Sequence, residues 1–158
     1  MGCGCHRVDV NCRLYLEVIV NDAICRAMED TDESWERVDK KLLPQMLAYK
    51  YHNTIAGIAV EMYQHAQGPV RDLAATLTAE LRIDEIQDST LDKLEWYTRR
   101  GINDEHKYAR FRATVAIIKH GWYEKRHLQA MKNNLEEVIG TESGKIAKLA
   151  NSYLKKIK

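Results

Sequence analysis

Residue types that bind metals gather in the segment HGWYEKRH, in the second half of the chain. His120, Glu124 and His127 are spaced i, i+4 and i+7, so on a continuous helix they share one face. Glu124 and His127 form the E-x-x-H pair of di-iron bundles, but such a site needs that pair twice, plus a Glu from each of two other helices. The chain contains one such pair. A ferritin-like bundle that holds iron or zinc is therefore one hypothesis, and an ordinary Glu–His pair is the other.

Three more side chains could complete a metal site. His65 falls on the apolar stripe of its expected helix, with Glu61 one turn earlier, and Glu95 falls beside the apolar positions Leu91 and Leu94, directly after Leu94 and one turn after Leu91. An ionised Glu that faces a core is costly unless it is paired or bound to a metal. A Glu–His or Glu–Arg pair in the core is the commoner of these two arrangements.

The first residues, MGCGCHRVDV, contain alternating glycines and cysteines. Gly2 before Cys3 and Cys5 is similar to the start of doubly acylated proteins, but their pattern has Ser or Thr where His6 stands. Cys3, Cys5, His6 and Cys12 could bind Zn²⁺, although C-x-C-H-x₅-C is not a usual zinc spacing. We therefore expect residues 1–9 to be a short segment that leads into the first helix.

The sequence offers no motif that indicates catalysis. A Gly-rich phosphate loop, G-x-S-x-G, H-E-x-x-H and C-x-x-C are all missing from it. We therefore expect a protein that binds or assembles and is not an enzyme.

Helical periodicity dominates the sequence. Two prolines and eight glycines among 158 residues are too few for a sandwich or a barrel. Apolar residues recur at i, i+3, i+4 and i+7, first over residues 12–28 and then over 34–42 and 44–67. The pattern predicts one all-α domain over residues 1–158, a bundle of five or six helices with a short terminal amphipathic helix.

The longest expected helix covers residues 104–139, with Gly121 as its weak point. Its halves place apolar side chains on opposite sides. The first stripe is Tyr108, Phe111, Val115, Ile118 and Trp122, and the second is Leu128, Met131, Leu135 and Val138. A helix with two opposite apolar faces suits an oligomer, so we predict that the second stripe contacts a neighbouring copy. The alternative is that the last helix folds back over it.

Charge is distributed unevenly. Residues 1–105 carry 12 Lys and Arg against 19 Asp and Glu, whereas residues 106–158 carry 12 against 4. The terminal segment 141–158 is a basic amphipathic helix. Its lysines are Lys145, Lys148, Lys155, Lys156 and Lys158. This basic end could bind nucleic acid, an acidic partner or the acidic body of another copy, or could be a solvated surface.

A helix-turn-helix is a further possibility for residues 77–101. DNA readers carry basic and amide side chains at the start of the second helix. This chain carries Asp84, Glu85, Asp88 and Asp92 there, and their carboxylates would repel phosphate. We therefore interpret residues 77–101 as two ordinary bundle helices.

These patterns favour an assembly protein. No window approaches 18 apolar residues, and no signal-peptide core precedes the first helix. We therefore expect a protein of the cytoplasm or of a virion, not secreted and without a transmembrane segment. The favoured function is a non-enzymatic assembly or adaptor protein, either a homo-oligomer or a subunit of a phage or viral particle. A metal-binding bundle and a nucleic-acid-binding protein are the alternatives.

Overall fold

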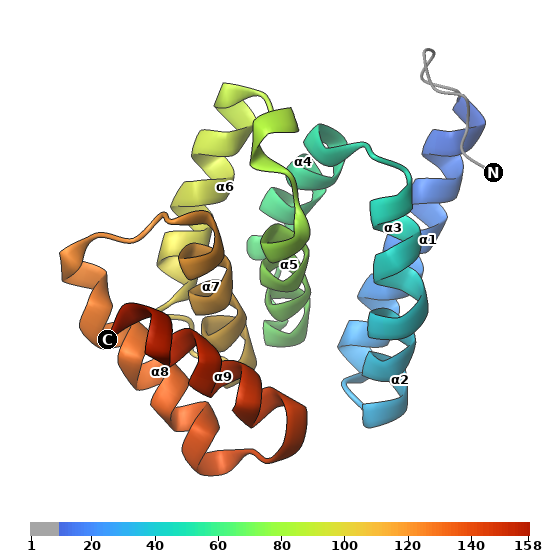
Figure 1. Cartoon of the computed structure of the whole chain (residues 1–158). Helices are drawn as coiled ribbons and strands as arrows, with labels where there is room; N and C mark the ends of the chain where they lie inside the picture. Colours follow the sequence, from blue (N-terminus) through green and yellow to red (C-terminus); the bar gives the residue numbers. More distant parts are fainter. Residues whose placement is uncertain (1–9) are drawn as a thin grey trace.

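The structure is a computed structural model that describes the backbone of residues 10–158 and the side chains of residues 14–158. Over this part of the chain it is helical, with no strand, which confirms the all-α class (Figure 1). The main helices are α1 Val10–Glu29, α2 Asp32–Arg37, α3 Leu43–Ala48, α4 His52–Tyr63, α5 Gly68–Glu80, α6 Asp88–Gly101, α7 Lys107–His120, α8 Leu128–Thr141 and α9 Gly144–Ile157. Short helical turns lie at Val38–Leu42, Ile83–Glu85 and Lys125–His127. The five or six helices that we predicted are too few.

The helix after α1 is interrupted by a π-helical segment. α2 begins at a capping box, in which the side chains of Thr31 and Ser34 each accept a hydrogen bond from the other residue's backbone N–H. Val38–Leu42 then widens into π-helical turns, and the N–H of Leu43 donates to the carbonyl of Val38, five residues back. Pro44 lies in the first turn of α3, as its missing N–H predicts. We attribute the widened turns to Pro44, because it cannot donate to the carbonyl four residues earlier.

The predicted helix over residues 44–67 is in fact two helices. α3 ends at Ala48 and α4 begins at His52, and between them Lys50 adopts a φ of 57°. This left-handed conformation ends the helix and turns the chain. As a result α3 packs on α1, whereas α4 packs on α5 and α6 (Figure 1).

Helix α5 is the centre of the bundle, because α1, α4, α6 and α7 all pack on it. Most of its side chains are buried, and several are small. The small buried ones are Ala74, Ala75, Thr78 and Ala79. Small side chains let two helix backbones approach closely, and α7, which packs on α5, also buries the small residues Ala109, Ala113 and Ala116.

The predicted continuous helix over residues 104–139 is wrong. α7 ends at His120, and Gly121 adopts a φ of 71°. The N–H of Gly121 donates to Ile118 O, and the N–H of Trp122 donates to Ile117 O, which is the hydrogen-bond pattern of a Schellman cap. Trp122 is buried directly after this cap. The glycine is therefore a stop signal, and α8 turns back and packs on α7.

Helices α8 and α9 form a hairpin that closes the bundle (Figure 1). The stripe Leu128, Met131, Leu135 and Val138 is covered by this chain itself. Met131, Leu135 and Val138 are fully buried, and Leu128 is partly buried against the core. These four residues are therefore not the contact with a neighbouring copy that we predicted, because the break at Gly121 turns them inward and α9 folds over α8.

Candidate interaction surface

Helix α1 is apolar on two sides, and the chain covers only one of them. Leu16, Val20, Ala23 and Ala27 point into the core and are buried. On the outer side, Leu14 is 54%, Tyr15 65%, Val18 66% and Met28 50% exposed. Cys25 is an exposed thiol on the same outer side. Large apolar side chains clustered on one helix face indicate a contact surface.

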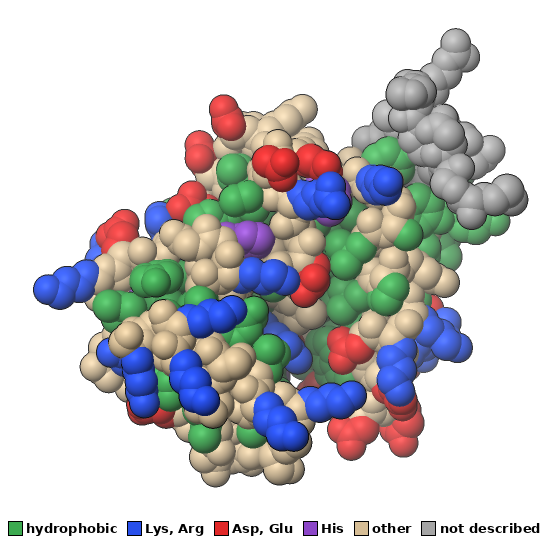
Figure 2. Space-filling model, in the orientation of Figure 1, with side chains coloured by type: hydrophobic (Ala, Val, Ile, Leu, Met, Phe, Trp, Pro, Cys, Tyr) green, Lys and Arg blue, Asp and Glu red, His purple; other side chains and the backbone are tan. Residues whose placement is uncertain are grey.

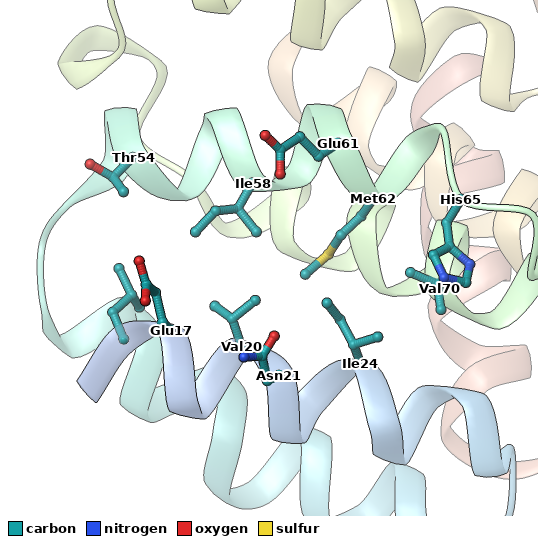
Figure 3. A pocket seen from close by; sticks show the side chains of 11 residues that line it. Glu17, Val20, Asn21, Ile24, Thr54, Ile58, Glu61, Met62, His65 and Val70 are labelled. Atoms are coloured by element: carbon teal, nitrogen blue, oxygen red, sulfur yellow. The ribbon is translucent and has the colours of Figure 1, made fainter. Parts of the chain in front are cut away.

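A groove of about 630 Å³ lies beside this outer face, between α1 and α4 (Figure 3). The side chains of Val20, Ile24, Ile58 and Met62 point into it from the two helices. Val70 of α5 closes one end, near His65 in Figure 3. The groove is therefore apolar along its middle and open to solvent.

Polar side chains stand around the groove. Glu17 and Asn21 come from α1, and Thr54 and Glu61 come from α4. Glu17 and Glu61 are exposed, and neither makes an ion pair among the described residues. Nδ1 of His65 accepts a hydrogen bond from the N–H of Gln67 at 3.0 Å, so this ring caps a turn. The groove therefore combines an apolar floor with acidic rims.

A strip of lysines covers the outer side of α9, which we call the lysine strip. Its members are Lys145, Lys148, Lys155 and Lys156, and all four are exposed. Lys158 follows the helix and is also exposed. The opposite side of α9 is apolar, and its buried residues Ala150, Leu154 and Ile157 contribute to the core. In Figure 2, Lys and Arg side chains gather over α9, while Asp and Glu side chains gather over α2.

The residues of the predicted metal site do not meet. Because of the break at Gly121, His120 ends α7, whereas Glu124 and His127 belong to the loop and short turn that follow. Nε2 of His120 lies 2.7 Å from the carbonyl oxygen of Thr78. Nδ1 of His127 accepts from the N–H of Glu124 at 3.0 Å, so the E-x-x-H pair is a capping box.

The other predicted ligands, Glu95, Glu61 and His65, lie in two separate places in the structure. Glu95 forms an ion pair with Arg99 at 2.8 Å, which is the Glu–Arg pair that we weighed against a metal. Glu61 and His65 line the groove described above together with Glu17, but these side chains do not form a group of three that could hold a metal ion. Across residues 14–158, no three His, Cys, Asp or Glu side chains form such a group. The zinc and acylation hypotheses for Gly2, Cys3, Cys5, His6 and Cys12 lie outside the described side chains.

One buried carboxyl was missed from the sequence. Asp72 of α5 is buried against α7, and its Oδ1 lies 4.0 Å from Nε of Arg112. Burial raises the pKa of Asp72 to about 7, against the opposing effect of the Arg112 charge. The negative charge of Asp39, in the π-helical segment, also raises the pKa of Asp72. The only sequence signal was the run of small residues in DLAATLTAE, which marks α5 as enclosed on all sides.

None of the helices in residues 10–158 is both long and apolar enough to span a membrane. Comparisons with protein-family models, with curated proteins and with solved structures find no match to this chain.

Proposed function

We propose that this protein is a non-enzymatic assembly protein that binds a second copy of itself through α1 and the groove between α1 and α4. The observation that carries the proposal is the two-sided apolar character of α1, of which the chain buries one side. Large apolar side chains gathered on an exposed helix face mark a site of contact with another molecule. The proposal includes homo-oligomers in general, phage and viral subunits among them.

The energetics favour covering this face. Fully burying one large apolar side chain contributes about 1.5–3 kcal/mol. Leu14, Tyr15, Val18 and Met28 are each at least half exposed, and the groove adds further apolar area beside them. This surface offers a partner more apolar contact than a scattering of single exposed residues would.

Charge supports a second copy as the partner. Residues 1–105, which hold the groove, carry 12 Lys and Arg against 19 Asp and Glu. Residues 106–158 are basic, with 12 Lys and Arg against 4 Glu. Two copies can therefore bring opposite charges together, which steers association and suppresses wrong partners.

The proposal is tested by native mass spectrometry and light scattering over a range of concentrations. We expect wild-type protein to form oligomers, and Val18→Glu to weaken association at least tenfold, because a carboxylate would be desolvated in the contact. Trp96→Glu is the matched control, since Trp96 is 50% exposed on α6, away from the groove. A wild-type monomer at every concentration would overturn the proposal, and so would equal association of Val18→Glu and wild type.

A further inference from the structure

We infer that the lysine strip of one copy docks onto the acidic-rimmed groove between α1 and α4 of the next copy. The inference rests on the proposed function and names the surface that covers α1. It makes the assembly head-to-tail, with two different faces of the same chain in each contact.

The lysine strip has no counterion of its own. Helix α9 contains no acidic residue, and none of its lysines forms an ion pair within the described part of the chain. Other lysines do find carboxylates, because Lys107 pairs with Glu142 at 2.8 Å and Lys119 with Glu80 at 3.2 Å. The strip is therefore a continuous cationic surface that is free to meet an external anion.

The groove offers the complementary charges. Glu17 stands on the α1 side and Glu61 on the α4 side, so carboxylates without a partner among the described residues flank an apolar floor (Figure 3). Farther along α1, Asp22 and Glu29 are paired with Arg26, and Asp22 also with Arg37. The attraction for a cationic helix therefore comes from Glu17 and Glu61.

Lysine is a suitable side chain for a surface of this composition. Its four-carbon stem can lie on apolar side chains while its ammonium group reaches a charge at the rim. Lys148 and Lys155 are seven residues apart on one side of α9, which is about 10 Å along the helix. Their stems would contact the apolar floor, and their ammonium groups would reach Glu17 and Glu61.

The two faces cannot meet within one chain. Figure 1 shows α1 on the right of the molecule and α9 at the lower left, where α9 packs on α8 and α7. The contact is therefore between copies. Each contact leaves one groove and one lysine strip unused at the two ends of the assembly, so association continues into a ring or an open chain.

A membrane is a poorer partner for α9 than another copy. Amphipathic helices that bind bilayers bury their apolar side in the lipid. The apolar side of α9 already packs on the core through Ala150, Leu154 and Ile157. Only the cationic side is left for a partner.

Two charge-reversal variants test the inference. In the strip variant, Lys148→Glu and Lys155→Glu cancel the charge of Lys145 and Lys156 and place carboxylates opposite Glu17 and Glu61. In the groove variant, Glu17→Lys and Glu61→Lys place ammonium groups opposite the lysine strip. Native mass spectrometry should show each variant alone as a monomer, because like charges then meet in its contact. All four positions are exposed, and circular dichroism confirms that the variants fold.

Mixing the variants gives the decisive result. In the mixture, the normal strip of the groove variant meets the normal groove of the strip variant, and the substituted strip and substituted groove again pair carboxylates with ammonium groups. An equimolar mixture should therefore recover association, whereas neither variant associates alone. A matched control reverses two exposed lysines outside the strip, Lys93→Glu and Lys125→Glu, and should assemble like wild type.

The possible failures can be distinguished. A wild-type monomer at all concentrations overturns the proposed function together with the inference. Oligomers of the strip variant that equal those of wild type overturn the inference alone, since the contact then joins identical faces. Loss of a bound nucleic acid from the strip variant, with unchanged self-association, assigns the lysines to nucleic acid and also overturns it.

Discussion

Asp72 and Arg112 face each other across the contact of α5 with α7, with 4.0 Å between Oδ1 and Nε. The separation leaves the carboxylate without a close ion pair, although Thr76 donates a hydrogen bond to it at 3.3 Å. Asp39 and Asp30, from the neighbouring π-helical segment and the end of α1, add negative charge near Asp72. The site therefore disfavours the ionised form, and the pKa of Asp72 is about 7.

Asp72 makes the stability of the fold depend on pH. Its pKa is about 7 in the folded chain and close to 3.8 in the unfolded chain, so between these values the folded state holds the extra proton. This contribution to the free energy of unfolding is fully present below pH 4 and is lost as pH rises to 7. A pKa difference of one unit is equivalent to about 1.4 kcal/mol. We expect the free energy of unfolding of Asp72→Asn to rise relative to that of wild type as pH rises from 4 to 8, because only wild type loses this contribution.

Urea unfolding at several pH values measures this difference. Asp92→Asn, at an exposed position on α6, is the control and should follow wild type throughout. A difference between Asp72→Asn and wild type that stays constant from pH 4 to pH 8 contradicts the prediction.

Gly121 ends α7 through its left-handed conformation. At φ 71° a Cβ would meet no atom within 4 Å, so only the backbone opposes a side chain there. We expect Gly121→Ala to lower the free energy of unfolding by about 1–2 kcal/mol. Gly57→Ala on α4 also adds a Cβ in open space, but at a helical φ, and should raise stability by about 0.5–1 kcal/mol. Thermal unfolding of the two variants should shift in opposite directions, and a shared direction would disprove the argument.

Gly101 permits the close approach of α6 to α7. A Cβ on it would lie 2.8 Å from the Cβ of Ala113, closer than real carbon atoms approach. We expect Gly101→Ala to destabilise the fold by about 1–3 kcal/mol, since the helices must separate. Adding Ala113→Gly removes the clash, so the double variant should recover part of the loss in chemical denaturation. If Ala113→Gly lowers the stability of Gly101→Ala further, the clash between the two Cβ atoms is not the cause of the destabilisation.

The sequence predicted the apolar stripes well and the helix ends poorly. Residues 44–67 were predicted to be helical from their apolar periodicity, and Leu47, Ile55, Ile58 and Met62 of that segment are each buried or packed against the core. Periodicity continues through short breaks, however, so it cannot show that Lys50 turns the chain between α3 and α4. The all-α class was therefore predictable, and the number of helices was not.

Gly121 shows which local signal outweighs periodicity. Basic residues followed by glycine are a signal for a helix end, and the sequence carries it twice, before Gly101 and before Gly121. In the structure Gly121 is the left-handed cap, while Gly101 is the last residue of α6. The metal site and the two-faced helix both depended on continuity at this one residue.

The groove could not be predicted because it depends on helix packing. Glu17 and Glu61 are 44 residues apart in sequence and come together only through the positions of α1 and α4 around α5. Glu61 and His65 were selected as ligands from their place on an apolar stripe. They do line a shared surface, but its chemistry is that of an acidic rim.

A buried hydroxyl network joins α4, α5 and α6. The hydroxyl of Tyr63 lies 3.2 Å from Oγ1 of Thr78 and 3.0 Å from Oγ1 of Thr98, and burial raises the pKa of Tyr63 to about 12. Because Tyr63→Phe leaves these two hydroxyls with one partner fewer, we expect it to lower the free energy of unfolding by about 1–2 kcal/mol. Tyr97→Phe, on the ring stacked against Tyr63, is the control and should cost less. In urea unfolding, Thr98→Val should cost less in the Tyr63→Phe background than alone, because the two residues share one interaction. Additive costs would show that the network is not coupled.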